Sequence, residues 1–349
     1  MADDYKPILS FQWHITTRCD QRCQHCYLFQ GSDETKQEIA GEKNIKSAEL
    51  KGIADNIVAS CERLEAEPYF ILTGGDPILH EHFWDLLEYI KEVSGNGVMI
   101  LGNPFHVTDD VAQRMKELEV DRYQVSLDGM RDFHDAMRKP GSFDATIEAI
   151  QILNRNKIES VVMSTVSKLN AGELPDLARY VADLKVSSYA FARYCPTKNG
   201  IDASETFAPL EYRDFLESMW NVYSELMESE TRFSLKDHLW ALFLKEIGVF
   251  APEDTDGVVV GGCGLGISHM TILADGTVYG CRRFTSPVGN ALVQDLDRVF
   301  LGRELEIYRD YSKKEKCRDC DLLNYCRGCI AVSACATGDW NSADPQCWM

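Results

Sequence analysis

The stretch Cys19-Asp20-Gln21-Arg22-Cys23-Gln24-His25-Cys26-Tyr27 decides how the rest of the chain is interpreted. Its three thiolates, on one tight loop after an apolar run, can hold three irons of a four-iron cluster, because such clusters are ligated by cysteine. The fourth iron is then free to bind a substrate or cofactor. The alternatives are buried thiols or a zinc site completed by His14 or His25, although structural zinc usually takes two separated cysteine pairs.

Around this loop, short apolar runs alternate with amphipathic stretches. The expected strands are 11–15, 69–72, 98–101, 123–127, 160–166 and 188–191, and the expected helices are 47–64, 81–93, 109–118, 143–154 and 174–184. Alternating units of this size indicate parallel strands with right-handed crossovers. We therefore predict an α/β fold, a partial (β/α)6 TIM-type barrel over residues 1–209. In such folds the loops after the strands carry the chemistry.

The second half of the chain has a different pattern. Two expected helices, 210–228 and 235–247, form a helical bridging region over residues 210–262. From Cys263 to the end, a hairpin around Asp275-Gly276 is followed by cysteines with little apolar sequence between them. A region this poor in core residues needs metal or other cross-links, so 263–349 is predicted to be a small cluster-binding domain.

Composition limits the classes of function. The net charge of -19 over 349 residues disfavours nucleic acid as a partner. No apolar run approaches the length of a membrane span and the N-terminus is polar, so a cytoplasmic protein without membrane association is expected. An odd number of cysteines, 13, in such a chain favours metal ligation over disulfides.

The cysteine loop resembles the defining motif of radical S-adenosylmethionine (radical SAM) enzymes, and two later motifs extend the resemblance. Thr73-Gly74-Gly75-Asp76-Pro77 is similar to the family's Gly-Gly-Glu-Pro segment, with Asp in place of Glu. The resemblance implies that this backbone binds the methionine amino group of the cofactor, with Asp76 as a charged acceptor. It also implies that Ser126 and Arg138 contact the cofactor's polar groups and that Tyr27 lies beside its adenine. Ordinary turns, a solvated helix face and core packing are the alternatives for these residues.

The later cysteines resemble the SPASM domain, which carries auxiliary iron–sulfur clusters. The pattern is Cys263-x12-Gly276-x4-Cys281, then Cys317-x2-Cys320-x5-Cys326-x2-Cys329, then Cys347, where the family often has three residues between the cysteines at 326 and 329. The resemblance assigns Cys263, Cys281 and Cys329 to a first auxiliary 4Fe-4S cluster. It assigns Cys317, Cys320, Cys326 and Cys347 to a second, which gives three 4Fe-4S clusters in all.

Three cysteines and one rival interpretation remain. Cys61 lies in a helical pattern and is expected to be a buried thiol. Cys335 is a candidate to complete the first auxiliary cluster, and Cys195, on the loop after the last expected strand, is a candidate to reach the active site and a possible additional ligand. Without either, that cluster keeps an open iron. The rival is zinc bound by the two close cysteine pairs, 317/320 and 326/329.

The resemblance implies reductive cleavage of S-adenosylmethionine to a 5'-deoxyadenosyl radical, fed by a donor such as ferredoxin or flavodoxin. The leading expectation is a maturase that forms a thioether or carbon–carbon link in a ribosomally synthesised peptide, or oxidises a residue. Because only about ten residues precede the first expected strand, a separate leader-peptide recognition protein is a candidate partner. The alternatives are a cofactor-biosynthesis enzyme acting on a tetrapyrrole or other small molecule, and a non-catalytic iron–sulfur or zinc scaffold. Arg282 stands where sulfatase-maturing relatives carry an acidic base, which disfavours that activity, and no catalytic base is identified.

Overall fold

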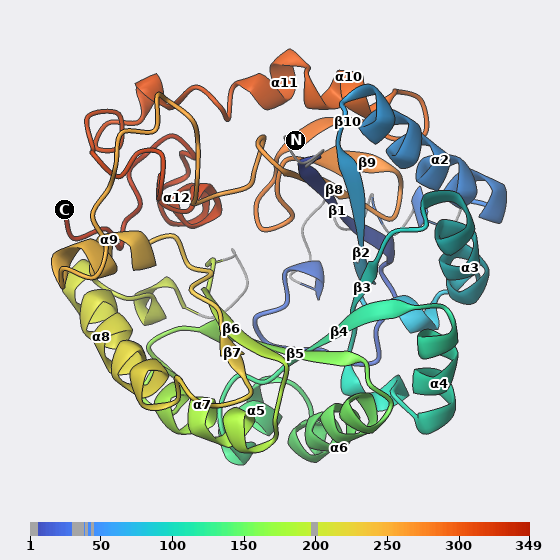
Figure 1. Cartoon of the computed structure of the whole chain (residues 1–349), viewed down its shortest axis with the longest axis horizontal. Helices are drawn as coiled ribbons and strands as arrows, with labels where there is room; N and C mark the ends of the chain where they lie inside the picture. The colour runs from blue at the N-terminus through green and yellow to red at the C-terminus, as the bar shows by residue number, and fades with distance from the viewer. Residues whose placement is uncertain (1–5, 30–37, 39–40, 43–44, 197–201) are drawn as a thin grey trace, which may run out of the picture.

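The computed structural model describes residues 6–29, 38, 41–42, 45–196 and 202–349, and it confirms the predicted partial α/β barrel. Its parallel strands follow one another in chain order along one curved sheet: β1 (Ile8–Thr16), β2 (Glu67–Gly74), β3 (Val98–Leu101), β4 (Val120–Ser126), β5 (Glu159–Val166) and β6 (Ser188–Arg193). The connecting helices cover the outer face (Figure 1): α2 (Ser47–Arg63), α3 (Phe83–Ser94), α4 (Asp109–Glu117), α5 (Arg131–Met137), α6 (Ser142–Arg155) and α7 (Leu174–Asp183). The six predicted strands and five predicted helices all exist, with ends that differ by a few residues.

The helix starts follow from local capping. α2 begins at Ser47 as predicted, and the Glu49 carboxylate accepts a hydrogen bond from the Lys46 backbone N–H at 2.8 Å. In α4 the capping residue is Thr108, whose Oγ1 accepts from the Val111 N–H at 3.3 Å. These side chains satisfy backbone donors that the first helical turn leaves without partners.

Segments from the second half of the chain extend the sheet at both edges. β7 (Arg232–Phe233) pairs parallel to β6, and β8 (His269–Ile272) pairs parallel to β1. The predicted hairpin is confirmed, because β9 (Thr277–Tyr279) runs antiparallel to β8, and β10 (Pro287–Asn290) adds a further antiparallel strand. The hairpin therefore lies directly beside the strand that leads into the cysteine loop.

The remaining helices lie around this second half: α8 (Pro209–Glu225), α9 (Trp240–Glu246), α10 (Leu296–Phe300), α11 (Arg303–Glu306) and α12 (Ile330–Thr337). α9 is shorter than the predicted 235–247, because the Asp237 carboxylate accepts the Leu239 N–H at 3.0 Å and fixes a turn before the helix. Among the described residues, no helix has both the length and the apolar character that a bilayer span needs.

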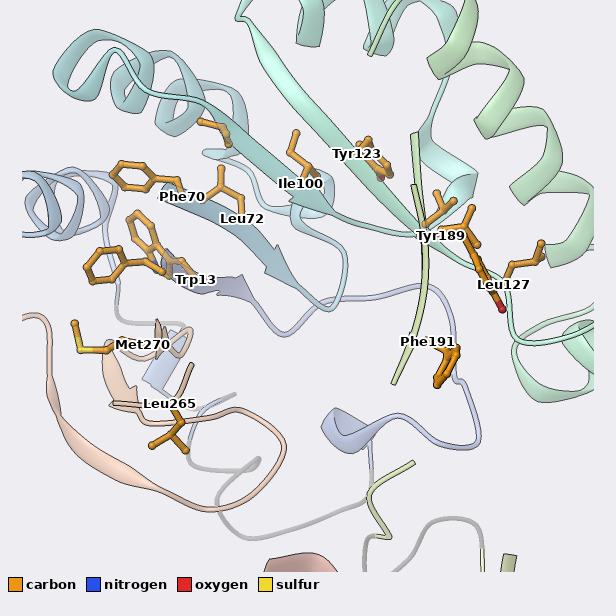
Figure 2. Close-up of a cluster of buried hydrophobic side chains, with 14 of the residues drawn as sticks. Trp13, Phe70, Leu72, Ile100, Tyr123, Leu127, Tyr189, Phe191, Leu265 and Met270 are labelled. Carbon is orange, nitrogen blue, oxygen red and sulfur yellow. The ribbon is translucent and has the colours of Figure 1, made fainter. Parts of the chain in front are cut away.

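One hydrophobic core joins the barrel and the C-terminal hairpin. Trp13, Phe70 and Tyr123 from the barrel strands are buried in the same cluster as Leu265 and Met270 from the second half (Figure 2). Burying a large apolar side chain stabilises a fold by roughly 1.5–3 kcal/mol. The hairpin is therefore held by packing as well as by its pairing with β1, which fixes its position relative to the barrel loops.

Candidate functional site

The three cysteines of the first loop follow β1, at the carboxyl end of the sheet. Asn103 Nδ2 lies 3.9 Å from Cys19 Sγ, and Arg138 Nη1 lies 3.7 Å from Cys23 Sγ, so N–H donors face the sulfurs. Burial raises the pKa of the Cys26 thiol to about 11, with the neighbouring Cys23 adding to the shift. A thiolate here therefore needs a nearby positive charge, which iron would supply.

The spacing of the sulfurs bears on which metal these cysteines suit. None of the 13 cysteines is in a disulfide. Only Asp20, Asp76 and His106, among the described residues, form a set of three or more metal-ligating side chains whose ligand atoms all lie within 4.8 Å of one another. Four sulfurs around one zinc would lie roughly 3.8 Å apart, given Zn–S bonds of about 2.3 Å. The cysteine groups are more open than that, so they fit a multi-iron cluster better than a single zinc ion.

Gly74 and Gly75 pack beneath this loop. The Gly75 N–H donates to the Thr16 carbonyl at 2.9 Å, and the Asp76 N–H donates to the Arg18 carbonyl at 2.7 Å. A Cβ at position 75 would lie 2.1 Å from the Arg18 oxygen and 2.8 Å from Cys19 Cβ. Glycine is required at position 75 because the two backbones touch there, so this segment packs closely against the cysteine loop.

Asp76 is placed differently from the other predicted cofactor residues. Its side chain is fully buried, lies 3.8 Å from His106 Nε2 and does not line the cavity described below. Burial raises the pKa of Asp76 to about 7, against smaller opposing contributions from the Ile78 and Asn103 N–H groups. The backbone of this segment faces the cavity while the carboxylate lies behind its wall, so contact of Asp76 with the cofactor stays a prediction.

Arg138 is held by Asp128, a residue that the sequence analysis did not select. Arg138 Nε donates to Asp128 Oδ2 at 2.6 Å, and both side chains are largely buried. Burial alone would raise the pKa of Asp128, but Arg138 and then His25 hold it well below its usual range. Asp128 Oδ1 also accepts the Thr165 N–H at 2.9 Å, which ties Arg138 to the ends of two strands. The signal was available, since Asp128 follows Ser126 at the end of a strand.

One cavity of about 360 Å³ is lined by most of the residues predicted to bind the first cluster and the cofactor. Its lining includes Cys19, Cys23, Cys26, Tyr27, Gly74, Gly75, Ser126, Arg138, Cys195 and Cys281. The Tyr27 ring lies under the Arg282 guanidinium, 5.0 Å from its centroid, and Arg282 pairs with the buried Glu38 at 2.6 Å. The cavity thus extends from the first cysteine loop to the residues of the C-terminal hairpin.

The predicted first auxiliary site gathers more cysteines than the sequence resemblance assigned. The His238 ring lies beside the thiols of Cys263 and Cys329, and Cys281 packs against the cluster that contains Cys329. The Cys195 thiol lies beside those of Cys329 and Cys335, so both additional candidates lie at this site. Arg283 approaches Cys329 Sγ at 3.7 Å. Sequence reasoning missed His238 and Arg283, which carry no motif.

The predicted second auxiliary site is also assembled. Cys317, Cys320, Cys326 and Cys347 line one small apolar pocket together with Leu239 and Leu242 from the start of α9. Cys61, in contrast, is a fully buried thiol within α2, as predicted.

A buried ionic network fixes these sites to the barrel. Arg193, at the end of β6, donates to Asp237 at 2.8 Å and to both oxygens of Asp344 at 2.7 and 2.8 Å. Asp344 also accepts the Cys329 N–H at 2.8 Å. The last strand of the barrel is thereby connected directly to a cysteine of the first auxiliary site.

A partial α/β barrel with three cysteines after its first strand, and further cysteine groups built onto its edge, defines an iron–sulfur enzyme that uses S-adenosylmethionine. Comparison with known protein families identifies two domains. The radical SAM superfamily matches residues 13–181, and the SPASM iron–sulfur cluster-binding domain matches residues 263–321. The chain belongs to the radical SAM superfamily and carries a SPASM domain.

The similar proteins include heme synthases and peptide maturases. The AdoMet-dependent heme synthase of Methanosarcina barkeri is 26% identical, over 96% of this chain and 95% of that protein. The mycofactocin maturase MftC of Mycolicibacterium smegmatis is 25% identical, over 96% of this chain and 81% of that protein. The crystal structure of Streptococcus suis SuiB bound to S-adenosylmethionine shares the fold with a TM-score of 0.76 at 17% identity, covering 99% of this chain and 78% of that one.

Proposed function

We propose that this radical SAM enzyme oxidises an organic substrate held between its first cysteine loop and its first auxiliary site. The observation that carries the proposal is the single cavity lined by Cys19, Cys23 and Cys26 at one side and by Cys195 and Cys281 at the other. When bound, the cofactors supply one electron that splits S-adenosylmethionine into methionine and a 5'-deoxyadenosyl radical, which takes a hydrogen atom from the substrate. Cysteines of the first auxiliary site, among them Cys281, would hold a cluster at the other side of the cavity, and that cluster could accept the electron that the substrate gives up on oxidation.

The chain's own residues bind and orient the cofactor and the substrate, and they exclude water from the cavity. Tyr27, held under Arg282, offers a flat face to the adenine, and Ser126 offers a hydroxyl at the end of β4. Asp128 fixes Arg138 beside Cys23, so that its cation faces the sulfurs rather than solvent. A preorganised donor of this kind stabilises charge without reorganisation during the reaction.

The first candidate substrate is a ribosomally synthesised peptide, modified by cross-linking or residue oxidation. The similarity to mycofactocin maturases over 96% of the chain supports it. A separate leader-recognition protein and a ferredoxin or flavodoxin are the proposed partners.

The second candidate is a tetrapyrrole. The similarity to a heme synthase over 95% of that protein supports it, and so does the charge of the cavity. Arg138, Arg193, Lys236, Arg282 and Arg283 line it, and no acidic residue among the described ones does. Such a lining suits a molecule that carries carboxylates.

The division of the chain follows as part of the proposal: a barrel over 1–209, a bridging region over 210–262 and the SPASM domain over 263–349. Three 4Fe-4S clusters are proposed, with the ligands named above for each. Cys195 and Cys335 both lie at the first auxiliary site, which supports four protein ligands there rather than an open iron.

Anaerobic reconstitution tests the proposal. About eleven to twelve irons per chain are expected from three clusters on cysteine thiolates, together with formation of 5'-deoxyadenosine under dithionite. The triple variant Cys19→Ala, Cys23→Ala, Cys26→Ala should lose about four irons and all 5'-deoxyadenosine, while Cys61→Ala, a matched thiol away from every site, should lose neither. A fully loaded wild-type protein that forms no 5'-deoxyadenosine would refute it.

A further inference from the structure

Lys236 supplies one of the positive charges that line the cavity. It lies between β7 and α9, lines the cavity and is exposed into it. Within the described residues its ammonium has neither a hydrogen-bond partner nor an ionic partner. A cation that lines the cavity and is not used by a protein carboxylate is available to a negatively charged group of a ligand.

The other cations of the cavity are already engaged by the protein. Arg138 pairs with Asp128, Arg193 with Asp237 and Asp344, and Arg282 with Glu38. Arg283 donates to the Arg193 carbonyl and faces Cys329 Sγ. Arg138, Arg193 and Arg282 thus have carboxylate partners that offset their charge, whereas Lys236 has none among the described residues.

The surroundings of Lys236 show which charge it would meet. Its neighbours within electrostatic range are Arg283, Cys281 and His269, and no carboxylate lines this cavity in the described part of the chain, although the whole chain carries a net charge of -19. The Lys236 and Arg283 cations lie close enough to repel each other, so an anion bound beside them is attracted by both. The part of the cavity beside Lys236 therefore favours a negatively charged ligand group.

We propose that Lys236 binds a carboxylate of the substrate and so determines that the enzyme takes carboxylate-bearing molecules. The inference rests on the proposed function, since it concerns the substrate of the same cavity. Because Lys236 lies near Cys281 and Arg283, the carboxylate is bound at the auxiliary side. The remainder of the substrate then extends toward the first cysteine loop, whose Cys19, Cys23 and Cys26 line the same cavity. Porphyrin propionates and a peptide C-terminus share this chemistry, and the experiment distinguishes them.

The test uses anaerobically reconstituted enzyme and two pairs of probes. The first pair is coproporphyrin III and its tetramethyl ester, and the second is the peptide N-acetyl-Ala-Ala-Ala-Tyr as the free acid and as the amide. Dissociation constants are measured by optical titration for wild type, Lys236→Met, Lys236→Arg and a control on the outer helix α4, Lys116→Met. At least one acid should bind wild type tenfold or more tightly than its neutral counterpart, and the pair that does so identifies the source of the carboxylate.

The variants show whether Lys236 is responsible. Lys236→Met should lose at least tenfold in affinity for that acid and nothing for the neutral form, while Lys236→Arg and Lys116→Met keep the preference. Affinity for S-adenosylmethionine should be unchanged. The inference is overturned if neither acid is preferred or if Lys236→Met keeps the preference. It is also overturned if Lys236→Met lowers the affinity for S-adenosylmethionine as much as the affinity for the acid.

The proposed function fails by a separate measurement. Formation of 5'-deoxyadenosine under dithionite without any probe should be equal in wild type and the control Lys116→Met. Its absence in wild type would refute the radical chemistry, whatever the probes do.

Discussion

Replacing Gly75 by alanine should remove the first cluster while leaving the fold and the auxiliary sites intact. A Cβ added there would lie 2.1 Å from the Arg18 carbonyl oxygen and 2.8 Å from Cys19 Cβ. Real Cβ contacts start near 3.0 Å, so the cysteine loop must move by 3.0 - 2.1, about 0.9 Å. The obstructing atoms belong to backbone and to a ligand residue, so no flexible side chain can relieve the contact.

The size of the effect follows from this displacement. Overpacking of a well-packed site costs about 1–3 kcal/mol, and a displacement of about 1 Å at a reacting centre costs on the order of 100-fold in rate. We therefore expect Gly75→Ala to lose about four irons per chain, since three cysteine thiolates hold one such cluster. Its 5'-deoxyadenosine formation should fall at least 100-fold, while the electron paramagnetic resonance signals of the auxiliary clusters remain.

Gly52→Ala is the matched control. Gly52 lies inside α2, and an added Cβ meets nothing within 4 Å. Alanine in a helix interior is favoured over glycine by about 1 kcal/mol, so this variant should melt slightly higher and keep its full iron content. A Gly75→Ala enzyme with wild-type iron and wild-type turnover would show that the two loops do not need this close approach.

Three further predictions concern single residues. Cys195→Ala should alter the electron paramagnetic resonance spectrum of the reduced first auxiliary cluster while Cys61→Ala leaves it unchanged; identical spectra for Cys195→Ala and wild type would exclude ligation by Cys195. The pKa of Asp76, about 7, lies above the ordinary value of 3.8, so its stabilising contribution is complete below pH 4 and is lost as the pH rises to 7. The unfolding free energy of wild type relative to Asp76→Asn should therefore fall by about 2 kcal/mol between pH 5.5 and 7, and a flat difference in denaturant titrations would contradict the buried placement. Arg193→Met leaves two buried carboxylates without their cation and should lower the free energy of unfolding by about 3–5 kcal/mol in the same assay. A loss below about 1 kcal/mol would mean that water reaches these ion pairs.

The barrel could be predicted from the sequence because its signals are local. Each strand of the first half is a short apolar run, each helix repeats apolar residues at a helical spacing, and turn residues separate them. α5 was not predicted because only His134 and Met137 of its seven residues are buried, and two buried residues are too few to show a helical periodicity. α12 was missed for the opposite reason, since its consecutive buried residues Ile330, Ala331 and Val332 show no polar face.

Pairings between distant segments could not be predicted. Ser10 lies opposite His269 in the β1–β8 ladder, and no pattern within either strand records that they meet. The same holds for His238 and Arg283 beside the auxiliary cysteines, which are single residues without a motif. The cysteines themselves were found because their spacing is the signal, although spacing alone did not show that Cys195 reaches Cys329.

The pairing of β8 with β1 has a consequence for electron transfer between the sites. β1 ends at Thr16, three residues before Cys19, and β8 leads through the hairpin to Cys281, so hydrogen bonds between adjacent strands join the two cysteine groups. At the other edge, Arg193 joins the end of β6 to Asp344 and, through it, to Cys329. Two independent connections on opposite sides of one cavity leave little freedom for the auxiliary site to move relative to the first loop. Because the separation of the redox centres is then set by the sheet and not by a flexible linker, a substrate placed between them would be within reach of both throughout the reaction.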